Sequence, residues 1–271
     1  MRSNPSDSGS PSSSSDEGLR YEQALESARP RLGRLGSPFC FFPTIGSTND
    51  AAASLPEGAV VVADQQTAGR GRRGHAWFSP PASGLYVSVV LAPRLATIDP
   101  LRATLLITLG AGVAIAEALE SSAGLRADLK WPNDLYVGRR KLAGILAESS
   151  GDTVILGYGI NIAPSAFPPE LRDRATSIES ELGRGVDRDE LFVETLAALS
   201  RRYEDLLNGR FDAILDAWRR RAPGAVGARV ARTVDGAVER GVTEGIDDRG
   251  ALLVRVGERI ERIVSGELTW D

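Results

Sequence analysis

Short apolar segments separated by polar turns run along most of this chain. Some of these segments have the pattern of strands and others have the pattern of helices. Strands are predicted at residues 38–43, 59–63, 85–91, 129–131, 135–137, 141–148 and 153–162. Apolar residues spaced three and four apart predict helices at 21–28, 101–123, 189–207 and 211–221. Ser47 and the three polar residues after it precede three alanines, a pattern typical of a helix start. The mixture predicts an α+β fold, in which helices pack on one face of a mixed sheet.

The pattern changes after Pro223-Gly224. Four short strands are predicted at 226–234, 237–246, 251–256 and 259–264, and Asp-Gly, Asp-Arg-Gly and Gly-Glu turns separate them. Closely spaced strands of this kind predict a small β-barrel. We therefore expect a large domain over residues 21–223 and a barrel over 224–271.

The N-terminal segment has a different composition. Residues 1–15 contain eight serines and two prolines, which predicts a disordered tail over residues 1–20. The tail lacks the apolar stretch of a secretory signal, so a cytoplasmic location is expected, and it is too short for a helix-turn-helix module. Continuous apolar runs fall short of the roughly 20 residues that a membrane span requires, so we expect no membrane association.

Rare residues and net charge limit the possible chemistry. A single cysteine, Cys40, and a single histidine, His75, exclude structural zinc sites and multi-histidine metal centres. The 32 basic and 36 acidic residues give a net charge of −4, which argues against a general nucleic-acid binder. Positive charge therefore matters only where it is clustered.

Residues 69–74, Gly-Arg-Gly-Arg-Arg-Gly, form such a cluster. Glycines let a backbone approach a ligand closely, and Arg70, Arg72 and Arg73 supply three guanidinium groups. The loop could be a solvated basic turn, an anion-binding loop or a contact for RNA or DNA. Because glycines and mutually repelling arginines form few internal contacts, we expect it to be mobile without a ligand.

A second cluster is Lys130-Trp131-Pro132-Asn133-Asp134. A carboxylate beside an amide in a rigid turn can hold hydrated Mg²⁺ on a polyphosphate, while the lysine neutralises phosphate charge. The alternative is a plain corner between elements, set by the proline.

Two further segments are ambiguous by themselves. Lys141 opens the run Lys-Leu-Ala-Gly-Ile-Leu, where it is either an inward-pointing active cation or a guard on an edge strand. Residues 157–161, Gly-Tyr-Gly-Ile-Asn, are typical of a tight strand exit.

Taken in order, these motifs resemble the biotin protein ligases over residues 41–161, and the C-terminal barrel resembles that family's SH3-like module. The resemblance implies a catalytic domain similar to class II aminoacyl-tRNA synthetases and biotin synthetases. It also implies a two-step reaction. Biotin and MgATP give biotinyl-5′-AMP and pyrophosphate, and a lysine of a biotin carboxyl carrier protein or domain, from acetyl-CoA carboxylase or a related carboxylase, then takes the biotin.

The resemblance also implies roles for individual residues. It places Lys141, Arg70 and Lys130 in catalysis. It implies that biotin is bound by Ser47, Thr48, Asn49, Gln66, Arg70, Gly71, Arg72, Lys141 and Gly144. It implies that ATP is bound by Arg70, Arg72, Lys130, Trp131, Asn133, Asp134 and Asn161, with Asp134 also serving the ATP-borne Mg²⁺.

Departures from the family pattern and rival interpretations remain. His75 stands where family members often carry an arginine, which makes the charge there weaker and dependent on pH. The DNA-binding domain of bifunctional members is not expected, so we predict a monofunctional ligase that is a monomer or weak homodimer. A lipoate ligase, a nucleic-acid-binding protein and a biotin sensor without turnover are the alternatives. The arginine loop weighs against a lipoate ligase, and the net charge weighs against a nucleic-acid-binding protein. The presence of both Lys130 and Lys141 weighs against a sensor.

Overall fold

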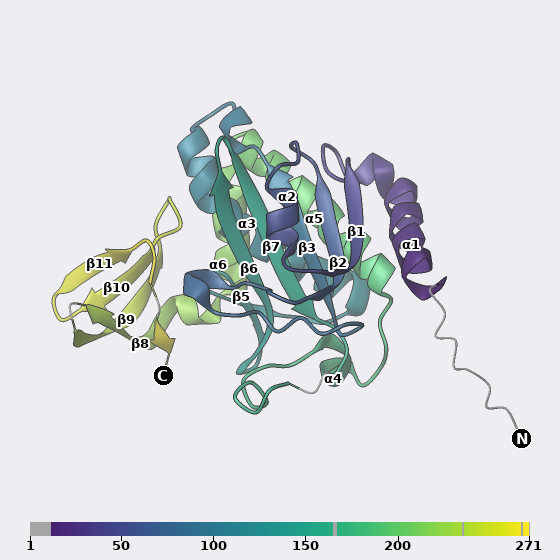
Figure 1. The fold of residues 1–271 in the computed structure, drawn as a ribbon. Helices are drawn as coiled ribbons and strands as arrows, with labels where there is room; N and C mark the ends of the chain where they lie inside the picture. Colours follow the sequence, from purple (N-terminus) through teal and green to yellow (C-terminus); the bar gives the residue numbers. More distant parts are fainter. Residues whose placement is uncertain (1–11, 165–166, 235, 267, 271) are drawn as a thin grey trace, which may run out of the picture.

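The computed structural model describes residues 12–270 except 165–166, 235 and 267, and these residues form two β-sheets (Figure 1). The larger sheet has seven strands in the order β1-β2-β3-β7-β6-β5-β4. The strands are β1 (Phe39–Ile45), β2 (Val60–Gln66), β3 (Gly84–Leu91), β4 (Asp128–Lys130), β5 (Asp134–Val137), β6 (Arg140–Ser150) and β7 (Thr153–Asn161). β1 and β2 are parallel and the other neighbours antiparallel, so the predicted mixed sheet is confirmed.

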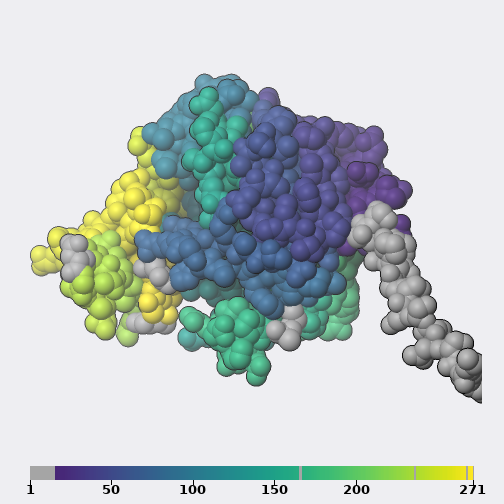
Figure 2. Space-filling model, in the orientation of Figure 1, coloured from purple at the N-terminus to yellow at the C-terminus, as the bar shows by residue number. Residues whose placement is uncertain are grey.

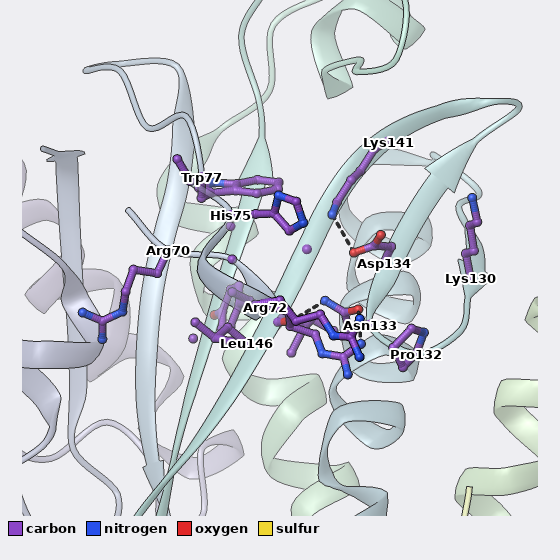
Figure 3. Close-up of a pocket in the computed structure, with 18 of the residues that line it drawn as sticks. Arg70, Arg72, His75, Trp77, Lys130, Pro132, Asn133, Asp134, Lys141 and Leu146 are labelled. Carbon is purple, nitrogen blue, oxygen red and sulfur yellow. Dashed lines mark hydrogen bonds and ion pairs between the residues drawn. The ribbon is translucent and has the colours of Figure 1, made fainter. Parts of the chain in front are cut away.

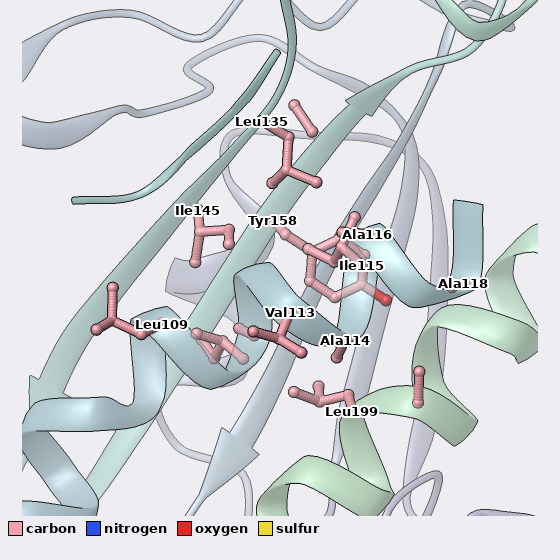
Figure 4. Close-up of a cluster of buried hydrophobic side chains, with 14 of the residues drawn as sticks. Leu109, Val113, Ala114, Ile115, Ala116, Ala118, Leu135, Ile145, Tyr158 and Leu199 are labelled. Atoms are coloured by element: carbon pink, nitrogen blue, oxygen red, sulfur yellow. The ribbon is translucent and has the colours of Figure 1, made fainter. Parts of the chain in front are cut away.

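The long helices cover one face of this sheet. They are α3 (Pro100–Ala118), α5 (Arg188–Leu207) and α6 (Phe211–Arg221), and a short helix α4 (Ile178–Leu182) precedes α5. α3 lies in the middle, where its Gly110 faces Leu206 of α5 and Ile214 of α6. Leu109, Val113 and Ile115 of α3, Tyr158 of β7 and Leu199 of α5 belong to the main core (Figure 4). The core therefore lies between the sheet and these three helices.

The predicted helix over 101–123 is α3 followed by a single π-helical turn, Leu119–Ala123, which ends where Gly124 adopts a left-handed conformation with φ of 69°. The segment Pro100–Ala123 is long and apolar enough to span a membrane by length and composition. Within this segment, 72% of the 18-residue apolar window is nevertheless buried inside the protein. Its hydrophobicity all round is therefore explained by its central place in the core.

Helix α1 (Ser12–Ala28) corrects the predicted tail. The prediction of disorder is wrong for residues 12–20, while residues 1–11 lie outside the described residues. Tyr21 is fully buried, with its ring 5.0 Å from that of Phe192 and 5.7 Å from that of Phe41. Glu17 Oε1 lies 3.2 Å from Arg188 Nη1 of α5. These tertiary contacts stabilise a helix that its serine-rich composition does not predict.

The opposite face of the sheet carries α2 (Thr48–Ala52), so the prediction that helices pack on one face holds for the long helices only. A second small core contains Ala52 of α2, Ala59, Val61 of β2, Val90 of β3 and Ile155 of β7. The rest of that face, over β6 and β7, is left for the candidate site described below.

The C-terminal sheet is antiparallel, with the order β11-β10-β9-β8-β12. Its strands are β8 (Val226–Val234), β9 (Ala237–Ile246), β10 (Leu252–Val256), β11 (Arg259–Ile263) and β12 (Thr269–Trp270). The first four were predicted, and β12 is additional. Trp131 Nε1 donates to Gly250 O at 3.0 Å, and Arg102 Nε donates to Asp248 O at 2.8 Å. Figure 2 shows this small domain, in green and yellow, lying against the large one.

Candidate active site

A cavity of about 310 Å³ lies on the face of the large sheet that the long helices leave open. Its walls come from α2, the arginine loop, strands β5 to β7 and the last residues of the C-terminal domain. It is lined by nearly all of the predicted site residues, which are Ser47, Thr48, Asn49, Gln66, Arg70, Gly71, Arg72, Lys130, Trp131, Asn133, Asp134, Lys141 and Gly144. The fold therefore brings together motifs spread over about a hundred residues of sequence.

A polar network forms the α2 end of the cavity. Thr48 donates from its backbone N and from Oγ1 to Gln66 Oε1, at 2.9 and 3.1 Å. Ser88 Oγ donates to Asn49 Oδ1 at 2.6 Å and also lies 2.8 Å from Thr48 Oγ1. Ser47, Thr48 and Asn49 are buried. The side-chain donors and acceptors of Thr48, Asn49 and Gln66 are thus held in fixed directions before any ligand arrives.

Glycines make room for the side chains of this end. A Cβ on Gly157 would lie 2.3 Å from Asn49 Oδ1, and one on Gly159 would lie 2.3 Å from Trp77 Nε1. A Cβ on Gly144 would lie 3.0 Å from the Trp77 ring. The glycines of the run 157–161 therefore allow Asn49 and Trp77 to pack directly on the sheet, which a strand exit alone would not require.

The arginine loop has more internal structure than its composition predicts. Gly71 N donates to His75 O at 2.7 Å, His75 N to Arg72 O at 3.1 Å, and Trp77 N to Gly69 O at 2.8 Å. Arg73, with φ of 56°, and Gly74, with φ of 78°, make the turn. The expectation of few internal contacts is therefore wrong, because backbone hydrogen bonds close the loop without help from its side chains.

Arg70 and Arg72 point in different directions (Figure 3). The Arg70 guanidinium turns away from Lys141 and pairs with Asp50, whose Oδ1 lies 2.7 Å from Arg70 Nη2. Arg72 reaches the Asn133 side of the cavity, and its Nη1 donates to Asn133 Oδ1 at 3.4 Å. Burial and the neighbouring Arg73 lower the pKa of Arg72. Arg72 is therefore the loop guanidinium that faces the centre of the site.

Lys141 and Asp134 meet at that centre. Lys141 Nζ lies 2.6 Å from Asp134 Oδ1 and 5.4 Å from the centroid of the Trp77 ring. Both side chains are largely shielded from solvent, with 30% of Lys141 and 22% of Asp134 exposed. The inward-pointing alternative for Lys141 is thus the one that the structure supports.

The turn at 131–134 is held firmly. Asn133 Nδ2 donates to Ile145 O at 2.7 Å, and Ile145 N donates to Asn133 O at 2.9 Å. These bonds fix the turn onto β6, next to Lys141. Asp134 therefore keeps its position by covalent geometry and sheet pairing, with its carboxylate paired to Lys141 inside the cavity.

Lys130 lies at the other end of the cavity, between aromatic rings of both domains. Its Nζ is 4.6 Å from the centroid of Tyr136 and 5.4 Å from that of Trp270. Burial lowers the pKa of Lys130 from its usual 10.5, while Asp134 acts in the opposite direction. An anion entering here would favour the charged form.

Asn161 is the predicted site residue that lies apart from the rest. Its amide Nδ2 donates to Thr176 O at 2.9 Å. Thr176 N in turn donates to Lys141 O, and Lys141 N donates to Arg174 O. Asn161 thus supports the segment beside Lys141 and does not face the cavity.

The lining residues that were not assigned from the sequence include Trp77, Tyr136, Arg174 and Trp270. Trp77 belongs to the arginine-loop motif and could have been found there. Trp270 could not, since it reaches the site only because β12 pairs with β8.

Asp134 is the one carboxylate among the described residues that line the cavity. Elsewhere in the described part of the chain, His, Cys, Asp and Glu form no group of three or more that could hold a metal ion. A single carboxylate fits Mg²⁺ that arrives on polyphosphate, because Mg²⁺ keeps several waters and takes few protein ligands.

Comparisons with known proteins agree with this site. The Biotin/lipoate A/B protein ligase family matches residues 42–163, which include most of the cavity, and the biotin protein ligase C terminal domain matches residues 227–268. The fold and the cavity thus define a ligase of the biotin and lipoate class. The chain is also 37% identical to the bifunctional ligase/repressor BirA of Bacillus subtilis, over 86% of this chain and 74% of that protein.

Two further relatives narrow the class. The biotin–[acetyl-CoA-carboxylase] ligase of Paracoccus denitrificans is 36% identical over 77% of this chain and 90% of its own length. The structure of biotin protein ligase from Aquifex aeolicus in complex with biotin and ATP has a TM-score of 0.75 and 30% identity, covering 87% of this chain and 99% of that one. The chain belongs to the biotin protein ligase family. The resemblance seen in the sequence is confirmed.

Proposed function

We propose that this chain is an ATP-dependent ligase that converts biotin and MgATP into biotinyl-5′-AMP and pyrophosphate, then transfers the biotinyl group to a lysine of a carrier protein. The observation that carries the proposal is the position of Lys141. Its ammonium lies beside Asp134 and Trp77, in the cavity that the buried polar network of α2 and Lys130 also line. The Aquifex aeolicus relative binds biotin and ATP, which supports a cavity that takes both substrates.

The α2 end suits biotin. Ser47, Thr48, Asn49 and Gln66 present fixed donors and acceptors, which a ureido group can match. Trp77 supplies an apolar wall for the sulfur-containing ring, and Gly144 leaves space beside it. A site that hydrogen-bonds a ligand so specifically rejects analogues that lack those groups, because buried polar groups would be left unpaired.

In the first step, a biotin carboxylate oxygen attacks the α-phosphorus of ATP and pyrophosphate leaves. Lys141 is placed to contact both anions and so to reduce their repulsion as charge builds at the α-phosphate. Arg72 and Lys130 are placed to bind the remaining phosphates. Mg²⁺ held through Asp134 would neutralise further phosphate charge. Arg70 pairs with Asp50, and we propose that it acts on the loop. The direct contacts with biotin and ATP that the resemblance implies for Arg70 stay a prediction.

In the second step, the carrier lysine amine attacks the acyl carbon of biotinyl-5′-AMP, an amide forms, and AMP leaves. The adenylate is intrinsically reactive, so the protein contributes by placing the amine and excluding water. The arginine loop lies beside the cavity where such exclusion is needed. The carrier is a biotin carboxyl carrier domain of acetyl-CoA carboxylase or a related carboxylase, as the Paracoccus relative's name indicates for that enzyme.

The location and remaining partners follow the same reasoning. We place the enzyme in the cytoplasm, with its carrier. The net charge of −4 and the one basic cluster give little support for DNA binding. The apolar helix Pro100–Ala123 is accounted for by burial in the core, so the proposal includes no membrane.

Pyrophosphate release tests the proposal. With ATP and Mg²⁺, biotin should start release and lipoate should not. Release with lipoate and none with biotin would assign the chain to the lipoate branch of the class. Binding of biotin without release would make it a sensor.

A further inference from the structure

Arg70 is held by two carboxylates from different elements. Its Nη1 donates to Asp50 Oδ2 at 2.8 Å, and its Nη2 lies 2.7 Å from Asp50 Oδ1, so the pair is bidentate. Arg70 Nη2 also donates to Glu148 Oε2 at 3.2 Å. Asp50 belongs to α2 and Glu148 to β6. We call these three residues the Arg70 clamp, because they attach the arginine loop to both elements.

Glu148 also joins the clamp to the biotin end of the cavity. The same Oε2 atom accepts a hydrogen bond from Asn49 Nδ2 at 2.5 Å. Asn49 is 5% exposed, lines the cavity and accepts from Ser88 through its Oδ1. One carboxylate oxygen therefore binds the loop arginine and the pocket amide together. A change in the position of Asn49 therefore changes the position of the Glu148 carboxylate that Arg70 contacts.

The clamp can open without unfolding the protein. The side chains of Arg70, Asp50 and Glu148 are 38%, 63% and 40% exposed, and exposed ion pairs contribute little to global stability. The hydrogen bond from Arg70 lowers the pKa of Asp50 below its usual 3.8, so this carboxylate is ionised at neutral pH. A bidentate but exposed pair suits a contact that must open for the ligand to enter and leave.

We propose that Asp50 and Glu148 are positioning residues that hold Arg70 and so keep the loop 69–74 beside the cavity, and that Glu148 links this hold to the filling of the biotin end through Asn49. The proposal rests on the proposed function, in which the loop retains biotinyl-5′-AMP. A ligand that hydrogen-bonds Asn49 further restrains an amide that Ser88 and Glu148 already hold, and through Glu148 this restraint favours the closed loop. Retention of the intermediate is then strongest when the pocket is occupied.

The test compares Asp50→Asn, Asp50→Glu and Glu148→Gln with the unchanged protein. Retention is measured as biotin attached to a lysine-rich bystander protein without a carrier domain. Lys130 and Lys141 are the only lysines of this chain, so self-labelling adds little background. Loop order is measured by hydrogen exchange of residues 69–77, with and without biotin.

Asp50→Asn should leave the rate of pyrophosphate release within about 2-fold but increase bystander labelling and loop exchange about 2- to 5-fold, as expected for loss of one exposed ion pair. Asp50→Glu keeps a carboxylate and should restore both readouts. Glu148→Gln should in addition raise the KM for biotin and weaken the protection that biotin gives the loop. These separate effects would not follow from general destabilisation.

Glu244→Gln is the matched control. It removes an exposed ion pair in the C-terminal domain, where Arg255 Nε lies 2.7 Å from Glu244 Oε1, and should change neither readout. Wild-type labelling and wild-type exchange in Asp50→Asn would overturn the clamp. If the unchanged protein released no pyrophosphate, the proposed function would fail, whereas loop exchange would still decide whether the clamp orders the loop.

Discussion

Lys141 Nζ and Asp134 Oδ1 lie 2.6 Å apart on neighbouring strands β6 and β5. The pair occupies the point where the α2 end of the cavity meets the Lys130 end. In the unliganded protein, Asp134 balances the charge of Lys141. When anionic substrates and Mg²⁺ enter, each member gains a partner of opposite charge, and the ammonium becomes available to the reacting groups. This exchange of partners explains why both charges can be kept in a partly buried site.

Loss of Lys141 should remove the main stabilisation of the first step. We expect Lys141→Gln to slow adenylate formation by about 10²–10³-fold, by analogy with the loss of an oxyanion donor, while the fold stays intact. Biotin-dependent pyrophosphate release gives the rate, and circular dichroism reports the fold. A folded variant with the wild-type rate would remove Lys141 from the mechanism.

Asp134→Asn should change the dependence of pyrophosphate release on the Mg²⁺ concentration. The amide cannot balance Lys141 or hold Mg²⁺ as strongly, so the Mg²⁺ concentration for half-maximal pyrophosphate release should rise while the KM for biotin changes less. Asp128→Asn is a suitable control, since Asp128 lies on the paired strand β4 outside the cavity. Equal Mg²⁺ dependence in both variants would contradict the assignment.

Most of the cavity could be predicted from the sequence because its residues sit in contiguous motifs. The run 130–134 and Lys141 keep their spacing when they fold into β4, β5 and β6, so local pattern and site geometry agree. The direction of Arg70 could not be predicted. It depends on Asp50 and Glu148, which the fold alone brings beside the loop.

The fold likewise has elements that local sequence pattern predicts and elements that depend on tertiary contacts. The strands and long helices follow from apolar periodicity, whereas the part of α1 before Tyr21 has no such pattern and contacts α5 through the ion pair of Glu17 with Arg188. β12 was missed because two residues carry too little pattern to predict a strand. The sequence around Trp270 therefore did not indicate that this residue lines the cavity.

Gly157 should tolerate no side chain. Its Cβ would lie 2.3 Å from Asn49 Oδ1, so Gly157→Ala must displace Asn49 from Ser88 and Glu148. Overpacking of this kind costs about 1–3 kcal/mol, so the KM for biotin should rise about 5- to 150-fold. Gly46→Ala meets open space and should bind biotin normally. Normal biotin binding in both variants would show that Asn49 is not part of the pocket.

Lys130 should give ATP binding an alkaline limit. Burial lowers its pKa, so in the free enzyme the ammonium loses its proton at a lower pH than an exposed lysine does, and binding of phosphates weakens as the pH rises past this lowered pKa. The KM for ATP should therefore increase at alkaline pH, with a smaller change in the KM for biotin. Lys130→Arg keeps its charge and should move this limit to higher pH. Superimposable profiles for the two proteins would exclude Lys130 from ATP binding.

The most direct test of the whole account is transfer of biotin to a carrier. The protein would be incubated with biotin, ATP, Mg²⁺ and an intact biotin carboxyl carrier domain, and the domain's mass would be followed over time. We expect one biotinyl group on a single lysine of the domain, formed only when both biotin and ATP are present, and much faster than on a short peptide copied from that lysine's turn. An unmodified carrier domain in the presence of both substrates would contradict the account.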